Sequence, residues 1–286
     1  MSKTIRSRYR CAQQGFSLVE LMISATLGLI MVGVVVSLYL SSKSSYRLND
    51  DNARLRADGD FAMTVIGRNL RQAGFGKLTS VSLNAPSSSR TDFIGQALRG
   101  CDAGAPCAAS AVSGKPGFEV SYRVADVLDR DAAIGTDCSG QAAPMLALPN
   151  DHPAAMVTPQ VRIASNRFYL AAKTGDAVPS LVCNGQPLIG NVEDMRLTYG
   201  IDTNGDFTPE QFLSSRAAIE SLADGWSKVV SVQVCLQLRG SNSIGEAQRY
   251  VDCSGAVRTA GDRRLRMVLR QVFTVRGHAA PSLSTI

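Results

Sequence analysis

The stretch GFSLVELMISATLGLIMVGVVVSLYL, residues 15–40, decides the fold of this 286-residue chain. From Leu21 to Leu40 every side chain is apolar, small or a hydroxyl, and a helix of that length spans roughly 30 Å, the thickness of a bilayer core. Glu20 lies just before this run, and an unpaired carboxylate in hydrocarbon costs about 2.5–3.5 kcal/mol on insertion scales. The stretch therefore predicts a transmembrane helix with one charge that needs a partner.

A basic tail precedes the apolar run. Residues 1–15 contain Lys3, Arg6, Arg8 and Arg10 and no acid, so they carry four of the chain's six net positive charges. Under the positive-inside rule, this tail stays in the cytoplasm and the rest of the chain faces outward. Since no small-residue cleavage site follows the run, we expect the anchor to be retained.

Three residues distinguish this anchor from an ordinary signal anchor. If the chain were cut between Gly15 and Phe16, a new α-amine would begin the helix and Glu20 would lie about one turn along it. A carboxylate in the first turn interacts favourably with the helix dipole. It could also neutralise an α-amine, either its own or that of a neighbouring chain.

At these positions, G-FSLVE resembles the type III signal motif of the type IV pilin family. The resemblance makes Gly15 the residue before the cut, Phe16 the N-methylated first residue and Glu20 the fifth residue of the mature chain. It implies a prepilin peptidase as the partner that cleaves and methylates the chain.

The helical pattern continues beyond the apolar run and predicts one helix from about Phe16 to about Gln72. A stripe with a seven-residue repeat marks its buried side: Leu48, Leu55, Ala62 and Asn69. Gly74 and Gly76 are typical stop signals. Gly59 and Gly67 lie inside the helix, where we expect bending.

The second half of this helix carries a further resemblance. The segment RLRADGDFAMTVIGRNLRQAGFG, residues 54–76, resembles a D-G-x-F-A…R-x-[IL]-R-x-A-G-[FY] segment of PilW-type minor pilins. Asn69 departs from the pattern, because the family usually has an acid there. The later order V-E-D-x-R-x-x-Y-G-x-D, W-x-x-V-x-x-V-x-V-x-L and a closing strand is similar to PilW and to J-type minor pseudopilins of type II secretion.

Strand patterns follow the helix. Alternating apolar residues predict strands in FEVSYRV, NVEDMRLTYGID, WSKVVSVQVCLQLRG and LRMVLRQVFTVR. QVRIASNRFYLAA reads as a hairpin that turns near Ser165 and Asn166, and SLVCNGQPLI as one that turns at Asn184 and Gly185. Residues 77–116 read as a loop. The resemblance implies an α+β pilin fold, with a long N-terminal α-helix packed on antiparallel β-sheet.

The expected organisation has four parts. They are a prepilin leader peptide over 1–15, a transmembrane and assembly helix over 16–40, an amphipathic half of the long helix over 41–76 and a periplasmic globular domain over 77–286. Before assembly the chain would be a single-pass inner-membrane protein with a cytoplasmic N-terminus, and after assembly it would lie in the pilus at the cell surface.

Six of the seven cysteines form an even set in the outward-facing part, since Cys11 belongs to the tail. An oxidising compartment favours disulfides, and six cysteines allow fifteen pairings. We favour Cys101–Cys107, Cys138–Cys183 and Cys235–Cys253.

A metal site is one interpretation of DTNGDFTPEQF. Asp202, Asn204 and Asp206 occupy the first, third and fifth positions of a calcium loop of the EF-hand kind. Phe207 stands where that loop needs Gly, and Leu213 where it needs a bidentate Glu. Because Asn204 and Gly205 are also a signal for a type I′ turn, a plain hairpin tip explains the same residues without calcium or any other cofactor.

Catalysis and nucleic-acid binding find little support. His152 and His278 lie far apart in the sequence, and no nucleophile or phosphate-loop motif is present, so we interpret the protein as non-enzymatic. The candidate basic stripe on the last strand consists of Arg264, Arg266, Arg270 and Arg276. A solvated strand face is the simpler interpretation, so we expect no direct nucleic-acid partner.

The resemblance implies a minor pilin of the type IV pilus, PilW-like, that takes part in initiating assembly. Its partners would be other minor pilins, the major pilin, a PilY-type adhesin and the inner-membrane assembly platform, with a position at the fibre tip. A J-type minor pseudopilin of type II secretion is the alternative with the same fold. A third hypothesis is a signal-anchored periplasmic module that never exposes Phe16 as an N-terminus.

Overall fold

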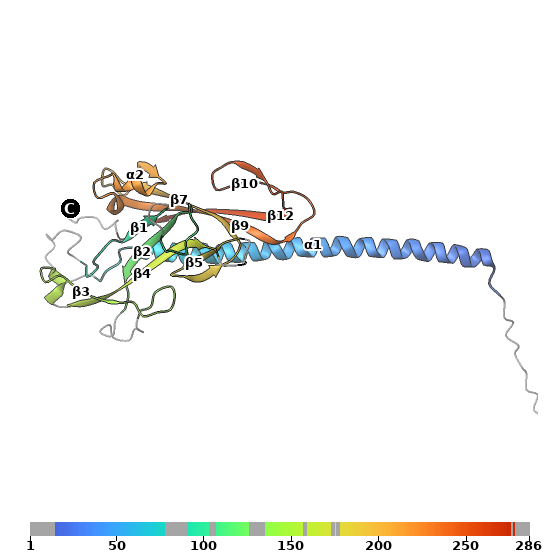
Figure 1. Cartoon of the computed structure of the whole chain (residues 1–286), viewed down its shortest axis with the longest axis horizontal. Helices are drawn as coiled ribbons and strands as arrows, with labels where there is room; N and C mark the ends of the chain where they lie inside the picture. Colours follow the sequence, from blue (N-terminus) through green and yellow to red (C-terminus); the bar gives the residue numbers. More distant parts are fainter. Residues whose placement is uncertain are drawn as a thin grey trace, which may run out of the picture. The chain divides into compact units, whose positions relative to one another are not determined.

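The computed structural model describes residues 15–77, 91–102, 107–125, 135–156, 159–172, 175, 178–275 and 277. The chain divides into two compact units, Met1–Asn49 and Asp50–Ile286. Helix α1 (Leu18–Gln72) contributes residues to both units. Figure 1 labels this helix and most strands of the second unit.

Helix α1 begins and ends where the sequence predicts. Its first intrahelical hydrogen bond runs from the Leu21 N–H to the Ser17 carbonyl (3.1 Å), so Ser17 is the N-cap residue. Beyond the other end, Gly74 adopts a φ of 70°, a left-handed conformation that glycine reaches without a Cβ clash. The predicted helix from about Phe16 to about Gln72 is confirmed.

In the amino-terminal unit, α1 exposes its apolar side chains. The large hydrophobic residues from Leu18 to Leu40 are 50–77% exposed. The hydroxyls of Ser24, Thr26 and Ser37 each donate to the carbonyl three residues earlier, at 2.8–3.0 Å. These polar groups are therefore satisfied within the helix, as an apolar environment requires. The helix is long and apolar enough to cross a membrane.

In the globular unit, the first sheet is antiparallel and has the strand order β1-β2-β4-β5-β6, with β3 also paired to β4. Its strands are β1 (Leu98–Cys101), β2 (Gly117–Arg123), β3 (Met145–Ala147), β4 (Gln160–Ala171), β5 (Ser180–Cys183) and β6 (Gln186–Ile189). The short 3-10 helix η2 (Pro153–Met156) precedes β4 in the chain.

The second sheet is also antiparallel and has the order β12-β9-β7-β8. Its strands are β7 (Val192–Ile201), β8 (Gln211–Leu213), β9 (Val229–Ser243) and β12 (Arg264–Thr274). Between β8 and β9 lie helix α2 (Arg216–Glu220) and the 3-10 helix η3 (Gly225–Lys228). A separate hairpin, β10 (Arg249–Val251) with β11 (Val257–Thr259), connects β9 to β12.

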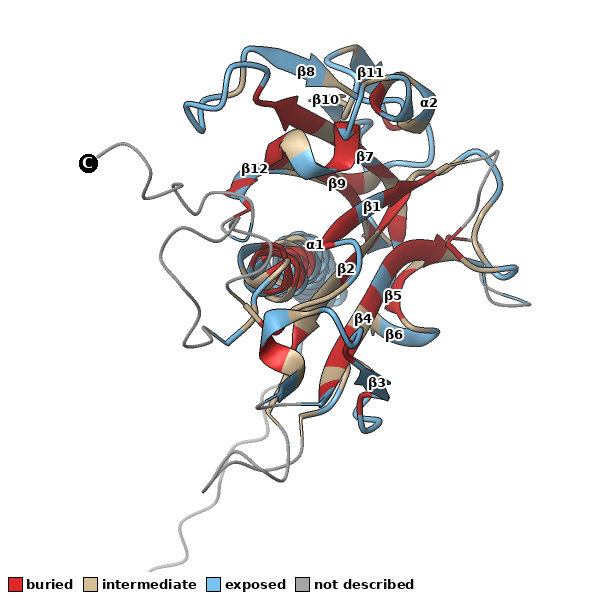
Figure 2. Ribbon diagram, turned by 90° about the vertical axis from the view of Figure 1, so that its left-hand side faces the viewer, coloured by how far each residue is buried: buried red, intermediate tan, exposed pale blue. Residues whose placement is uncertain are grey.

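Residues 50–72 of α1 pack between the two sheets. Figure 2 shows the helix nearly end-on, with β12 on one side of it and β2 on another. The apolar residues on its buried side are at most 5% exposed: Leu55, Ala62, Met63, Ile66 and Leu70. Such contacts supply most of the stability of a helix in a folded domain.

Two glycines permit the close contact between α1 and β12. A Cβ atom on Gly59 would lie 2.7 Å from Leu269 Cδ1, and one on Gly67 would lie 2.3 Å from Phe273 Cε1. The sequence predicts bending at these glycines, whereas the structure gives each a packing role. A side chain at either position would overlap the strand above it.

The long strand predictions are confirmed. In β7, the predicted inward residues are all buried: Met195, Leu197, Tyr199 and Ile201. In β9, the same is true of Val230, Val232, Val234, Leu236 and Leu238. The hairpin at Asn184 and Gly185 is also confirmed, since both residues have the positive φ that a tight turn between β5 and β6 requires.

Two other predictions are wrong. The pattern predicts a turn at Ser165 and Asn166, but β4 runs without interruption from Gln160 to Ala171. Asn166 is 1% exposed, because its side chain is bonded to α1 and β2 and has no role in a turn. Within residues 77–116, predicted as a loop, the structure forms β1.

Three disulfides cross-link the globular unit. They join Cys101 to Cys107, Cys138 to Cys183, and Cys235 to Cys253. These are the pairs favoured from the sequence. Cys235 lies on the face of β9 opposite to its apolar residues, so its bridge ties the β10–β11 hairpin to the outer face of the second sheet.

Candidate assembly site

The predicted processing and assembly residues lie at the start of α1. Gly15 and Phe16 precede the helix, and Phe16 is 81% exposed. Glu20 is in the first helical turn and is also exposed. Ser17 and Glu20 have the spacing of a capping box, in which a carboxylate lies over the free N–H groups of a helix start. In the part of the chain that the structure describes, no cation lies within ion-pair distance of Glu20.

The apolar side chains that follow Glu20 along the helix are not buried by other described residues of the same unit. All large apolar residues from Leu18 to Leu40 are at least half exposed. Soluble monomers rarely expose apolar patches of more than a few hundred square ångströms. Lipid chains or other apolar helices therefore have to cover this surface, and both environments would make an unpaired Glu20 costly.

Asn69, which stands where the resembled family usually has an acid, belongs to a buried polar cluster. Its Oδ1 atom accepts hydrogen bonds from Asn166 Nδ2 (2.6 Å) and from the Tyr122 hydroxyl (3.2 Å). Its own Nδ2 donates to the Val65 carbonyl (2.9 Å). Burial raises the pKa of Tyr122, which keeps its hydroxyl neutral and able to donate. An uncharged residue thus suits position 69, because the surrounding groups are neutral donors and acceptors.

The proposed calcium loop connects β7 to β8. Asp202 is 6% exposed and accepts backbone hydrogen bonds from Asn204 (3.1 Å), Gly205 (2.6 Å) and Phe207 (2.8 Å). Phe207 adopts a φ of 66°, the left-handed conformation for which an EF-hand loop uses Gly. Of the predicted turn residues, Gly205 has a positive φ and Asn204 does not, so the type I′ turn is not formed.

Glu210 joins this loop, and the sequence pattern did not single it out. Carboxylate oxygens of Asp202, Asp206 and Glu210 all lie within 4.8 Å of one another. Glu210 also accepts from the Thr203 N–H (2.8 Å), and the Thr208 N–H lowers the pKa of Asp206. Oxygen ligands of this kind suit calcium. Because the same oxygens are already hydrogen-bonded within the loop, calcium binding stays a prediction.

The described arginines of the basic stripe on β12 make hydrogen bonds within the chain, and Arg266 is also ion-paired. Arg266 has a side chain that is 8% exposed, and it pairs with Glu193 (2.6 Å) and Asp262 (2.9 Å). Arg264 donates to the Ser241 carbonyl, and Arg270 donates to the Asp252 carbonyl. Arg276 lies outside the described residues. This pairing favours the interpretation of the stripe as a structural strand face.

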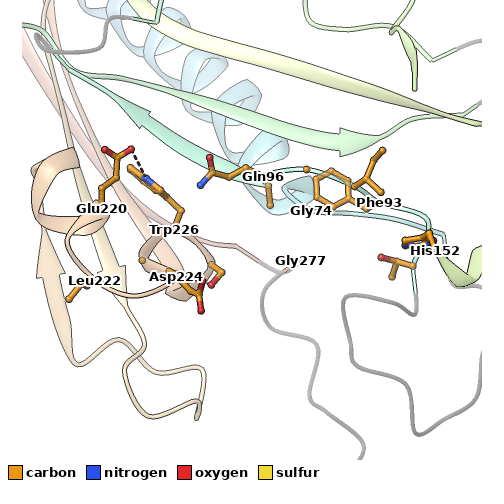
Figure 3. A pocket seen from close by; sticks show the side chains of 15 residues that line it. Gly74, Phe93, Gln96, His152, Glu220, Leu222, Asp224, Trp226 and Gly277 are labelled. Carbon is orange, nitrogen blue, oxygen red and sulfur yellow. Dashed lines mark hydrogen bonds between the residues drawn. The ribbon is translucent and has the colours of Figure 1, made fainter. Parts of the chain in front are cut away.

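A cavity of about 830 Å³ lies in the globular unit (Figure 3), lined by residues 91 and 93–97, by α2 and η3, and by His152 and Gly277. Trp226 donates its indole N–H to Glu220 Oε1 (3.4 Å) at one end, and His152 lies at the other. His152 Nδ1 accepts from the Ala154 N–H (3.1 Å). The described residues bring no carboxylate to His152, so they form no acid–base pair there; His278 lies outside the described residues.

Comparisons with known proteins give two family matches and one similar solved structure. Residues 10–36 match the model of the prokaryotic N-terminal methylation motif, and residues 167–277 match the model of the type IV pilus-assembly protein W family, PilW. Among solved structures, a type IV-like pilin from Thermus thermophilus is similar, with 14% identity and a TM-score of 0.38; the match covers 78% of this chain and 98% of that chain. The comparison with curated proteins finds no similar protein.

The two family matches carry different information. The methylation motif implies processing by a prepilin peptidase and, together with the apolar helix, indicates a membrane-anchored pilin. The PilW match implies work with other pilus components and indicates a structural protein. The two matched segments, residues 10–36 and 167–277, and the α+β architecture of one long N-terminal helix on antiparallel sheets make the chain similar to type IV pilin-like minor pilins of the PilW type.

Proposed function

We propose that the chain enters a type IV pilus through residues 16–40, after cleavage between Gly15 and Phe16 and N-methylation of Phe16. The exposed apolar surface from Leu18 to Leu40 is the observation that carries this proposal. A helix of this kind is stable in a bilayer, and it is equally stable among identical helices in a fibre. Transfer from membrane to fibre exchanges one apolar environment for another at little cost.

In this proposal, the carboxylate of Glu20 forms an ion pair with the positive α-amine of Phe16 in a neighbouring subunit. Its position in the first helical turn supports this role, because the carboxylate lies at the helix end where the two groups would meet. An ion pair in a water-poor environment is favourable only when both partners are present. A misplaced subunit would leave both charges unpaired, so the pair would also set the depth of insertion.

We further propose that the chain initiates assembly at the fibre tip and is not an enzyme. It would act there with other minor pilins, the major pilin and a PilY-type adhesin, on the inner-membrane platform. Before assembly, its amino terminus would be cytoplasmic and its globular unit periplasmic. The PilW match and three disulfides, which suit an oxidising compartment, support this assignment.

Replacement of Glu20 tests the proposal. We expect Glu20→Ala and Glu20→Gln to be cleaved and methylated as the wild type is, but to be absent from sheared pili. Glu20→Asp, which keeps the charge, should retain part of the incorporation. The measurements are the intact mass of the membrane-extracted protein and immunoblots of the pilus fraction.

Three results would contradict the proposal. Normal incorporation of Glu20→Gln would show that the carboxylate charge is not needed. An unprocessed wild-type chain would instead support the simple signal-anchored module. A deletion strain that keeps its pili but loses protein secretion would favour the J-type pseudopilin.

A further inference from the structure

Strand β12 forms one edge of the second sheet. The order β12-β9-β7-β8 leaves β12 with β9 as its one neighbour among the described strands. Figure 2 shows β12 at one end of this sheet, beside β9. An edge strand presents a row of free N–H and C=O groups, which another strand can bind.

The direction of the free groups follows from the register. Val275 donates to the Val230 carbonyl (2.9 Å), and each residue pair from Thr274 with Ser231 to Arg266 with Arg239 follows without a shift. In an antiparallel pair, hydrogen-bonded positions alternate. The odd-numbered residues of β12 therefore bond to β9, while the N–H and C=O groups of the even-numbered residues point away from the sheet.

At one even-numbered residue of β12, Arg266, a side chain takes the place of a neighbouring strand. The Arg266 N–H donates to Gln248 Oε1 (2.7 Å), and Gln248 Nε2 donates to the Arg266 carbonyl (3.4 Å). The glutamine amide thus imitates one residue of a neighbouring strand, and it confirms the direction deduced from the register. Beyond Gln248, no described backbone group pairs with the outer edge from Val268 to Thr274.

This part of the edge is accessible. Arg270, Gln271, Val272 and Thr274 are exposed, and Val272 is 58% exposed although it is apolar. The side chains of Val268, Arg270 and Val272 share the outer face of the sheet. Residues 59–67 of α1 lie under the same strand, where Gly59 and Gly67 contact Leu269 and Phe273. A subunit packed beside this helix would therefore lie next to the β12 edge.

The side chains also indicate what kind of strand fits. Opposite residues on one face of an antiparallel pair interact, and opposite charges are favourable there. Val268, Arg270 and Val272 therefore fit a segment with the alternating pattern apolar, acidic, apolar. A second copy of β12 fits less well, because antiparallel pairing of residues 268–274 with themselves would place Val272 opposite Arg270 and would supply no acidic partner.

We propose that an extended, acidic segment of another pilin-like subunit adds to the second sheet along residues 268–274 of β12. This inference rests on the proposed function, since it names how the minor pilin holds a partner. Backbone hydrogen bonds would supply the affinity, and the Val-Arg-Val pattern would supply the choice of partner.

Substitution of Val272 tests the edge. Val272→Pro removes one outward N–H and no bond to β9, and proline is tolerated on edge strands. Val272→Thr keeps that N–H and is the matched control. We expect the proline variant to co-purify about tenfold less of a pilin-like subunit from piliated cells, and the threonine variant to stay within about twofold of wild type.

A photo-crosslinking residue at position 272 provides an independent measurement. Its matched control is the same residue at Val257 of β11, which is 61% exposed. We expect an adduct at 272, absent at 257, that maps to an acidic extended segment of a pilin-like subunit. Arg270→Glu should weaken this adduct, and Arg270→Lys should retain it.

Different experimental results would contradict strand addition at β12 and the proposed function. Equal partner recovery with Val272→Pro and Val272→Thr would overturn strand addition, provided that both form the three disulfides. If the proline variant misfolds, the absence of a 272-specific adduct in the otherwise wild-type chain would overturn it instead. Failure of the wild-type chain itself to enter pili would overturn the proposed function.

Discussion

Residues 18–40 and residues 50–72 belong to the same helix, but their side chains have opposite surroundings. The first set is exposed and apolar, and the second set buries one side among the two sheets. A Cβ atom added to Gly28 or Gly33 would meet no described atom within 4 Å, whereas one added to Gly59 or Gly67 would meet strand side chains within 3 Å. The second half of α1 therefore finds its partners inside the chain, while the first half needs partners from outside it.

The largest difference between the two halves of α1 should appear when a glycine in each half is replaced by leucine and the free energy of unfolding is compared. Gly67→Leu places atoms where Phe273 lies, so we expect the globular unit to lose about 3 kcal/mol or more of its free energy of unfolding. Gly28→Leu should leave that free energy unchanged. Denaturant unfolding of both variants in detergent, followed by tryptophan fluorescence of Trp226, gives the measurement; equal stabilities would refute the packing role of Gly67.

Two aspartates on α1 offer a smaller test. Asp51 is 2% exposed and accepts from the Asn242 N–H (2.9 Å) and Asn242 Nδ2 (2.8 Å), whereas Asp60 is exposed. We expect Asp51→Ala to cost about 1–3 kcal/mol, because two donors lose their acceptor. Asp60→Ala should change stability by less than about 0.5 kcal/mol. A similar loss for both variants, measured by thermal unfolding, would show that burial does not distinguish the two sites.

Asp262 should show a weaker effect that depends on pH. A hydrogen bond from Arg266 lowers the pKa of Asp262 below its ordinary value of 3.8, although burial acts in the opposite direction. A lowered folded-state pKa means that the ionised form stabilises the fold above about pH 4, and that this stability is lost as the pH falls further. We expect Asp262→Asn to cost no more than about 1 kcal/mol at pH 7. The difference from wild type should close as the pH falls below the ordinary pKa; a constant difference would reject the ionic origin.

The smallest expected effect concerns calcium. Asp202 already accepts three backbone hydrogen bonds, in contrast to Glu20, which has no described donor. The hairpin interpretation therefore predicts that calcium, compared with EDTA, leaves the melting temperature of the globular unit unchanged. A saturable rise that Asp206→Asn abolishes would establish a calcium site instead. Bound calcium at about 100 times its Kd would add about 2.7 kcal/mol, well within detection.

The sequence predicts those parts of the molecule whose signals are local. Residues 15–40, the helix end at Gly74 and the alternating strands β7 and β9 each depend on neighbouring residues, and their predicted structure is confirmed. The cysteine pairs also agree with the structure. Glu20 stands out in the sequence because a charge beside an apolar run is conspicuous without any tertiary contact.

The sequence does not predict features that depend on distant contacts. Asn166 reads as a turn residue until Asn69 and Tyr122 are known to lie beside it. Glu210 joins Asp202 and Asp206 through the path of a loop that has no regular pattern. Arg123 reads as an exposed strand position, yet it is buried against Asp92 at 2.7 Å. Asn166 and Arg123 are buried because partners far away in the sequence satisfy their polar groups.

The contact between Asp51 and Asn242 has a mechanical consequence. Asp51 is the second residue of the globular unit, and its partner lies 191 residues later in the chain. Tension applied along the amino-terminal half of α1 would reach this carboxylate before it reaches the apolar core. Two hydrogen bonds would have to break together at this contact. The contact can therefore resist the pulling force at the point where the helix would otherwise begin to separate from the sheet.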